Sequence, residues 1–266
     1  MAEAFSETLA YPQVKKRAVA SRSFRTKITP SNGSTFNGGN TIHLDLPGNL
    51  AGQYYNPSQM YLKFKIQNSV AATQLDRAGA ISCIKRVQLQ NSGAALFDCN
   101  NWNVLATALM DTDCSADWKA SSGSVLMGTQ GDQLQGEALG AAAARTYCVP
   151  MMLNPLSMTT PHRLIPAFSL SALQFRITLE NDIIVGNAGA AVPVFTYSDV
   201  EMVCLMTELS PGAQSQIDSM TGGQYNILAN SYINSQATLA AGVSSLTANL
   251  GISVSSLERI LVVHRP

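Results

Sequence analysis

The sequence is short of charge. Charged residues occupy 13% of its 266 positions, about half of the quarter that is usual for soluble domains. Lys plus Arg equals Asp plus Glu at 17 each, so the overall balance gives no sign of a nucleic-acid or membrane binder. A chain with so few charges is expected to have part of its surface covered by other subunits.

Closely spaced cysteines are also missing. None of the five cysteines has the spacing of a zinc knuckle or a redox dithiol. The odd number argues against an oxidising compartment, where an unpaired thiol is a hazard. We therefore expect an intracellular protein with reduced thiols. Four of them lie in or beside apolar segments, where cysteine packs as a small hydrophobic residue: Cys83, Cys99, Cys148 and Cys204.

Signals for export and catalysis are lacking as well. The start carries Glu3 where a signal peptide needs a basic residue, and no apolar run reaches the roughly 18 residues of a spanning helix. The three histidines share no short spacing, and no nucleophile elbow or phosphate loop is present. Asp111 and Asp113 resemble a carboxylate pair, but at a helix end such a pair is more often a cap and a solvated turn. We expect no enzyme activity, no metal and no cofactor.

What the sequence does contain is alternation. Between positions 173 and 180 four large apolar residues alternate with four polar ones. A helix would scatter the apolar four around its circumference, whereas a strand places them on one face. The segment is therefore predicted to be an inner strand of a β sandwich. The apolar residues are Leu173, Phe175, Ile177 and Leu179.

Other segments predict more strands. They are 41–46, 60–67, 81–90, 94–99, 147–153 and 199–209. The segments 81–90 and 94–99 form a hairpin around Asn91, Ser92 and Gly93. The run 199–209 is almost continuously apolar, as expected of a strand buried on both faces. The fold class is thus all-β, an antiparallel sandwich whose core is predicted to contain Leu62, Phe64, Phe175, Ile177, Val203 and Leu205.

Two short helices interrupt the strands. Apolar residues recur at helical steps over 102–109, with Asn100 or Asn101 placed to cap the start. Pro211 suits the first position of a second helix over 211–220, a connector. Beyond it 225–233, 246–254 and 260–263 are strand-like again. We interpret 41–210 as one domain and 211–266 as the connector and the start of a second strand set.

Two segments are candidates for contacts between subunits. Residues 1–40 are predicted to be a flexible basic arm, either a solvated tail or a segment that binds a neighbouring subunit. Its cations are Lys15, Lys16, Arg17, Arg22, Arg25 and Lys27. Residues 112–146 are predicted to be a long loop that packs on an adjacent subunit, because structureless loops of this length are usually functional. Its apolar residues are Val125, Leu126, Met127, Leu134 and Leu139.

The order of these pieces resembles a known family. The polar arm, strand 41–46, the Asn56-Pro57-Ser58 turn, the hairpin at 91–93 and segment 164–182 look like the first half of a hexon-like major capsid protein. Segment 197–209, the helical connector and 255–265 are similar to the passage from the first jelly roll into the second in double-jelly-roll capsid proteins of double-stranded DNA viruses. The resemblance covers most of the chain.

The resemblance implies a structural role. It implies a jelly-roll sandwich in a trimeric, pseudo-hexagonal capsomer of an icosahedral virion assembled in the host cell, with no enzyme activity. The partners would be copies of the chain and, through the arm, minor capsid proteins or an acidic capsid interior. A single-jelly-roll capsid or spike protein is an alternative. A carbohydrate-binding module is another, although Trp102 and Trp118 are the only tryptophans available for a sugar-binding face.

Overall fold

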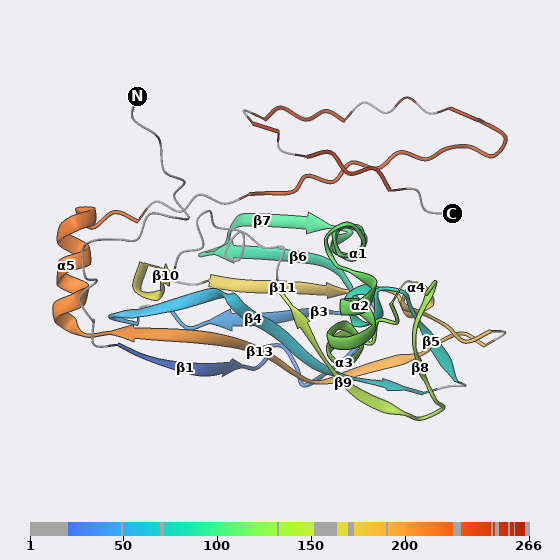
Figure 1. The fold of residues 1–266 in the computed structure, drawn as a ribbon, viewed down its shortest axis with the longest axis horizontal. Coiled ribbons are helices and arrows are strands. Elements are labelled where there is room, and N and C mark those ends of the chain that lie inside the picture. Colours follow the sequence, from blue (N-terminus) through green and yellow to red (C-terminus); the bar gives the residue numbers. More distant parts are fainter. Residues whose placement is uncertain are drawn as a thin grey trace, which may run out of the picture.

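Two antiparallel sheets face each other (Figure 1). The computed structural model describes residues 21–263, apart from 49, 70–71, 132, 152–163, 170–172, 190, 226–229, 246, 248–249, 255 and 258. In the first sheet the order is β1-β13-β4-β10, with β2 paired to β13 and β9 to β4. These strands are β1 (Ser21–Ile28), β2 (Thr35–Asn37), β4 (Gln53–Asn68), β9 (Ala144–Pro150), β10 (Ile165–Pro166) and β13 (Phe195–Leu209).

The second sheet has the order β3-β11-β6-β7. Its strands are β3 (Thr41–Leu46), β6 (Ile84–Asn91), β7 (Ala94–Asn100) and β11 (Leu173–Leu179). A small third sheet, β12-β5-β8, lies at one end of the molecule (Figure 1). It contains β5 (Thr73–Asp76), β8 (Gln135–Leu139) and β12 (Gly186–Asn187). The antiparallel sandwich predicted from the alternation is confirmed, and so is the predicted hairpin, which is formed by β6 and β7.

Strand β11 is the inner strand that its alternation predicted. Every second residue along it is buried, and Phe175 and Ile177 are completely so. It lies between β3 and β6, so that Phe175 is paired with Leu44 on one side and Leu89 on the other. The four buried apolar side chains are worth about 6 to 12 kcal/mol of hydrophobic stabilisation.

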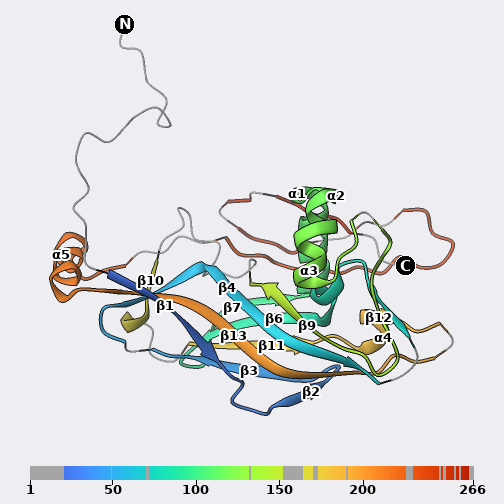
Figure 2. The same cartoon turned by 60° about the horizontal axis from the view of Figure 1, so that its bottom comes forward.

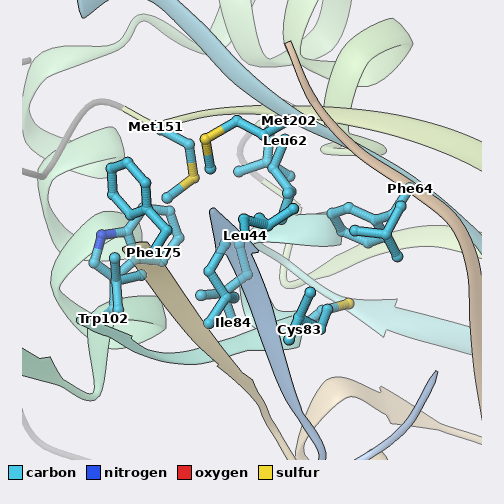
Figure 3. Packing of buried hydrophobic residues seen from close by; sticks show 14 of the residues in the cluster. Leu44, Leu62, Phe64, Cys83, Ile84, Trp102, Met151, Phe175 and Met202 are labelled. Atoms are coloured by element: carbon cyan, nitrogen blue, oxygen red, sulfur yellow. The ribbon is translucent and has the colours of Figure 1, made fainter. Parts of the chain in front are cut away.

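The core lies between the two sheets (Figure 3). Leu62 and Phe64 of β4 enter it from the first sheet, and Leu44 and Phe175 enter it from the second. Trp102 is 1% exposed in the same cluster, which leaves it inside the molecule and away from any sugar-binding face.

The core prediction is wrong for Leu205 of β13, and Val203 is buried as predicted, at 3% exposed, but lies outside the cluster between the sheets. Met202, Cys204 and Met206 belong to the core, so the alternation turns Val203 and Leu205 to the outer face of the sheet. The pairing of β13 with β4 shifts register at two places along this stretch. A one-residue shift exchanges the two faces of a strand. Because the run 199–209 is almost continuously apolar, it contains no alternation from which the side chains that face the core could be predicted.

The helices occupy the connections. They are α1 (Trp102–Asp113), α2 (Ala116–Trp118), α3 (Ser124–Met127), α4 (Asp182–Val185) and α5 (Pro211–Thr221), with the short turns η2 (Gly79–Cys83), η3 (Lys119–Gly123) and η4 (Ala167–Ser169). Helices α1 and α5 confirm the predictions for 102–109 and 211–220. Asn101 occupies the N-cap position of α1 in a left-handed conformation, φ 51°, and makes no capping bond through its side chain.

The predicted loop over 112–146 is wrong. Helix α1 continues to Asp113, and 116–127 form a further helical segment with one π turn, which we name the helical excursion. Lys119, Gly123 and Met127 recur every four residues and are buried. Two of these three are not hydrophobic, so apolar periodicity could not predict the helix. Strand β8 and the start of β9 follow at 135–139 and 144–146.

The predicted arm over 1–40 is wrong for its second half. Residues 21–28 form β1, which pairs with β13 along its whole length, from Ser21 with Leu209 to Ile28 with Met202. Ile28 is buried and Phe24 packs against the core. Strand pairing and these two side chains outweigh the cations between them. Residues 1–20 lie outside the described part of the chain.

The strands expected after the connector are absent from the described residues of 230–263, which contain neither helix nor strand. Many apolar side chains are exposed there, among them Ile233, Leu250 and Val262. Asn234 and Arg259 contact the ends of α1, at Asn101 and Asp113. A strand needs a neighbour to satisfy its backbone, and no described strand of the sandwich pairs with this segment.

Candidate assembly surfaces

The outer face of the first sheet gathers positive charge, and we name its four cations the basic face. Alternation along β1 and β4 turns these side chains away from the core. Lys27 and Tyr61 lie on either side of Val203 in the register of β1, β13 and β4. Figure 2 shows the three strands as one continuous layer. The four cations are Arg25, Lys27, Lys63 and Lys65.

Glu201 lies within the basic face. Its Oε2 is 3.3 Å from Nζ of Lys27 and 3.2 Å from Nζ of Lys63. Burial acts to raise the pKa of Glu201, but the hydrogen bonds from Lys63 and Lys27 outweigh it and lower the pKa below its usual value. The carboxylate therefore stays ionised at neutral pH and balances one of the cations.

The six cations of the predicted arm have different surroundings in the structure. Lys15, Lys16 and Arg17 lie outside the described residues. Arg22 pairs with Glu208 at 2.6 Å, whereas Arg25 and Lys27 join the basic face. Lys63 and Lys65 were not predicted as site residues: their alternation in β4 was visible, but the pairing of β1 and β4 with β13 was not.

The five apolar residues of the predicted loop differ in exposure. Val125 and Leu134 are 71% and 83% exposed, and Leu126 is 38% exposed. Met127 and Leu139 are buried in the core of their own chain. The prediction that these two contact a neighbouring subunit is therefore wrong: both fill the space beside the small third sheet and η2.

Polar contacts fix the helical excursion on the sandwich. Glu137 of β8 pairs with Arg145 and accepts a hydrogen bond from Tyr147 Oη at 3.1 Å. Arg145 also donates to the backbone oxygen of Ser124 at 3.4 Å. At the other end Thr129 donates from Oγ1 to the backbone oxygen of Lys119 at 2.7 Å. The excursion is thus a fixed projection of the fold.

A charged cavity lies behind the excursion. Its volume is about 360 Å³. Asp111 at its wall pairs with Arg77 and with Lys119, whose Nζ is 3.5 Å from Oδ1. The pair with Lys119 joins α1 to the excursion, the pair with Arg77 joins α1 to the turn before η2, and we assign the cavity this supporting role. The lining residues are Arg77, Met110, Asp111, Lys119, Gly131 and Gln133.

Three of the cysteines are buried, and burial governs their thiols. Burial raises the pKa of Cys83 and of Cys204 to about 12 and that of Cys99 to about 11, so these groups stay protonated at neutral pH. Within the residues that the structure describes, no three His, Cys, Asp or Glu side chains are grouped closely enough to hold a metal ion. No helix in that part of the chain has the length and apolar character needed to cross a bilayer.

Solved structures resemble this fold, whereas no protein-family model and no curated protein matches the sequence. The Faustovirus major capsid protein is similar with a TM-score of 0.55 at 11% identity, over 79% of this chain and 58% of its own. The PBCV-1 virus capsid is similar with a TM-score of 0.50 at 15% identity, over 77% of this chain and 46% of that chain.

At these identities the likeness concerns the fold. The sandwich is of the jelly-roll type, as the resemblance implied. This chain spans about half the length of the two capsid chains that it matches.

Proposed function

We propose that this protein is a structural subunit of an icosahedral virus capsid, and that its capsomers are trimers of pseudo-hexagonal outline. One observation carries the proposal: a jelly-roll sandwich similar to the Faustovirus major capsid protein over 79% of the chain. A fold alone does not define a function. The chemistry of the described residues agrees with a structural role, because its buried thiols are protonated and its ion pairs join elements of the fold.

The surface supports self-association. A charged fraction of 13% is low for a protein that exposes all its faces to water. Large apolar side chains are exposed at Val125, Leu134, Ile183 and Val192, and such side chains on a structural protein are natural contacts between copies. Three copies related by a closed rotation would cover them without open-ended growth.

The segment after α5 supports a further contact. Helix α5 is fixed at the end of the first sheet, because Tyr54 Oη donates to Gln214 at 2.6 Å and Phe168 packs edge-on between Tyr54 and Tyr225. The chain therefore leaves the roll in a defined direction. The exposed apolar residues of 230–263 would then be covered by a second jelly roll, as in the two-roll arrangement that the resemblance implies.

The test is assembly of the purified chain. Sedimentation velocity at micromolar concentration should find trimers or larger closed species, and electron microscopy should show plates or shells with a hexagonal lattice. A stable monomer at every concentration and ionic strength would overturn the proposal. Specific retention on immobilised glycans would favour the carbohydrate-binding alternative.

A further inference from the structure

The cations of the basic face outnumber the carboxylates that pair with them. The four cations lie around the carboxylate of Glu201. Lys27 and Lys63 share Glu201. Arg25 and Lys65 form no ion pair with any residue in the described ranges, and Arg25 is exposed. Tyr61 and Leu205, both half-buried, lie among these cations.

The helical excursion presents the opposite charge. Asp117, Ser121 and Val125 recur every four residues on its exposed side, two positions away from the buried Lys119, Gly123 and Met127. Asp113, at the end of α1, is 59% exposed. We name Asp113, Asp117 and Val125 the acidic stripe. Arg259 Nη1 lies 3.9 Å from Oδ1 of Asp113, too far for a strong exposed pair.

The two surfaces lie on opposite sides of the first sheet. Arg145 pairs with Ile66, a core residue of β4, so its side chain leaves β9 on the core side. The excursion contacts Arg145 through Ser124 and therefore lies on that side as well. The basic face lies on the other side, and both views show α1 to α3 apart from β1 (Figures 1 and 2). A contact between them requires two molecules.

We propose that the basic face of one copy binds the acidic stripe of the next copy. Arg25 and Lys65 would pair with Asp113 and Asp117, while Val125 packs against Tyr61 and Leu205. Charges of one sign on each surface steer the encounter and fix its register. Because the two surfaces differ, the contact runs head to tail, which is the geometry that closes rings such as trimers. The inference rests on the proposed self-assembly and names the surfaces that perform it.

The experiment is a charge swap on the full 266-residue chain. One variant carries Arg25→Glu and Lys65→Glu, a second carries Asp113→Lys and Asp117→Lys, and a third carries all four changes. Exchange of Arg86 and Asp98, an ion pair on the other sheet, is the control. Circular dichroism and melting establish that each variant is folded, and sedimentation velocity at low and high salt measures association.

The expected result is loss followed by rescue. Each double variant should associate about tenfold more weakly than the parent, and the parent should itself weaken with salt. The fourfold variant should regain association because opposite charges face each other again at every contact. The control should behave as the parent does.

Other outcomes overturn the inference in different ways. Folded double variants that associate like the parent, or a fourfold variant that stays weak, would refute these surfaces while self-assembly stands. A parent chain that is monomeric throughout would refute the proposed function too. A short DNA duplex tests a third possibility. If the parent binds it, and only the variant with Arg25→Glu and Lys65→Glu loses both DNA binding and association, then the basic face binds nucleic acid and not the acidic stripe of another copy.

Discussion

Asn103 donates a hydrogen bond from Nδ2 to Oε2 of Glu180 at 3.2 Å, and both side chains are almost completely buried. Glu180 Oε1 also accepts from the backbone nitrogen of Asn181 at 3.1 Å and lies 3.4 Å from Nζ of Lys85. The contact joins the first turn of α1 to the end of β11. A buried carboxylate needs every partner it has.

The first prediction removes that partner. Asn103→Ala should lower the free energy of unfolding by about 2 to 3 kcal/mol, because the buried carboxyl group of Glu180 would lose one of its hydrogen-bond donors. Urea unfolding followed by circular dichroism measures the change. Asn100→Ala, at an exposed position of β7, is the control and should change stability by less than about 0.5 kcal/mol. Equal effects of the two substitutions would contradict the role of the buried contact.

The second prediction tests which face of β13 points into the core. Met202→Ala should cost about 2 to 5 kcal/mol because it leaves a cavity in the core, whereas Leu205→Ala removes a half-buried side chain on the outer face and should cost about 1 kcal/mol or less. Thermal melts of the two variants show whether Met202 or Leu205 lies on the face of β13 that is buried in the core. A larger loss for Leu205→Ala than for Met202→Ala would mean that the outer face is the core.

Strand alternation was the most informative signal in the sequence. In β3, β4 and β11 each apolar residue at an even spacing became a core residue, since one face of each strand is buried and period two fixes which residues share it. The α5 helix was also predictable, because Ser210 and Pro211 carry the chemistry of a helix start.

Long-range pairing was not predictable. Arg25 and Lys27 were interpreted as members of a flexible arm because the local composition is basic and polar, yet β13, some 180 residues later, provides the neighbour that makes β1 a strand. The basic face has the same origin, because β13 pairs with β1 on one side and with β4 on the other and so places their cations on one face. The helical excursion was missed because its buried side contains Lys119 and Gly123, residues that no hydrophobic pattern includes.

The third prediction concerns the contact between η2 and the excursion. Gly79 has φ +59° and lies so close to Met127 that an added Cβ would overlap the Met127 carbonyl. Gly79→Ala should therefore cost about 1 to 3 kcal/mol more than backbone strain alone. Gly93→Ala is the control, because Gly93 also has a positive φ, +86°, but open space around its Cβ position.

Two measurements separate these glycine variants. Gly93→Ala should lose only about 1 to 2 kcal/mol, and its helical excursion should stay resistant to protease. Gly79→Ala should lose more stability and become cleavable between 115 and 130. Equal melting temperatures for the two variants would show that the close approach to Met127 contributes little.

The fourth prediction is a pH dependence at Asp182, the first residue of α4. Oδ2 accepts from the backbone nitrogen of Phe195 at 3.1 Å, while Oδ1 is buried and has no hydrogen-bond partner among the residues that the structure describes. Burial raises the pKa of Asp182 above 3.8, although the Phe195 hydrogen bond opposes the change. A raised pKa in the folded state means that this group favours folding below pH 3.8, and that the benefit is lost as the pH rises through the raised value.

Asp182→Asn removes the titration and keeps the shape. The variant should melt at or above the parent temperature at pH 7, and the difference between variant and parent should shrink as the pH falls toward 4. Melting curves from pH 4 to pH 7 measure it. Asp98→Asn behaves oppositely, because the hydrogen bond from Arg86 lowers the pKa of Asp98 and the ionised pair stabilises the fold at neutral pH. A constant difference for Asp182→Asn across this range would contradict the assignment.

The last prediction separates β1 from the residues before it. Deleting 1–28 removes the buried Ile28 and the half-buried Phe24 and frees the edge of β13, so it should cost about 2 to 4 kcal/mol from lost burial alone and promote aggregation through the open edge. Deleting 1–20 keeps β1 whole and is the matched control, with a melting temperature within about 2 °C of the full chain. The shorter deletion also removes Lys15, Lys16 and Arg17, so weaker, less salt-sensitive assembly of this folded variant would assign those cations to contacts with a neighbour. Equal melting temperatures for the two deletions would mean that β1 adds nothing to the sandwich, and that the basic segment acts as an arm along its full length.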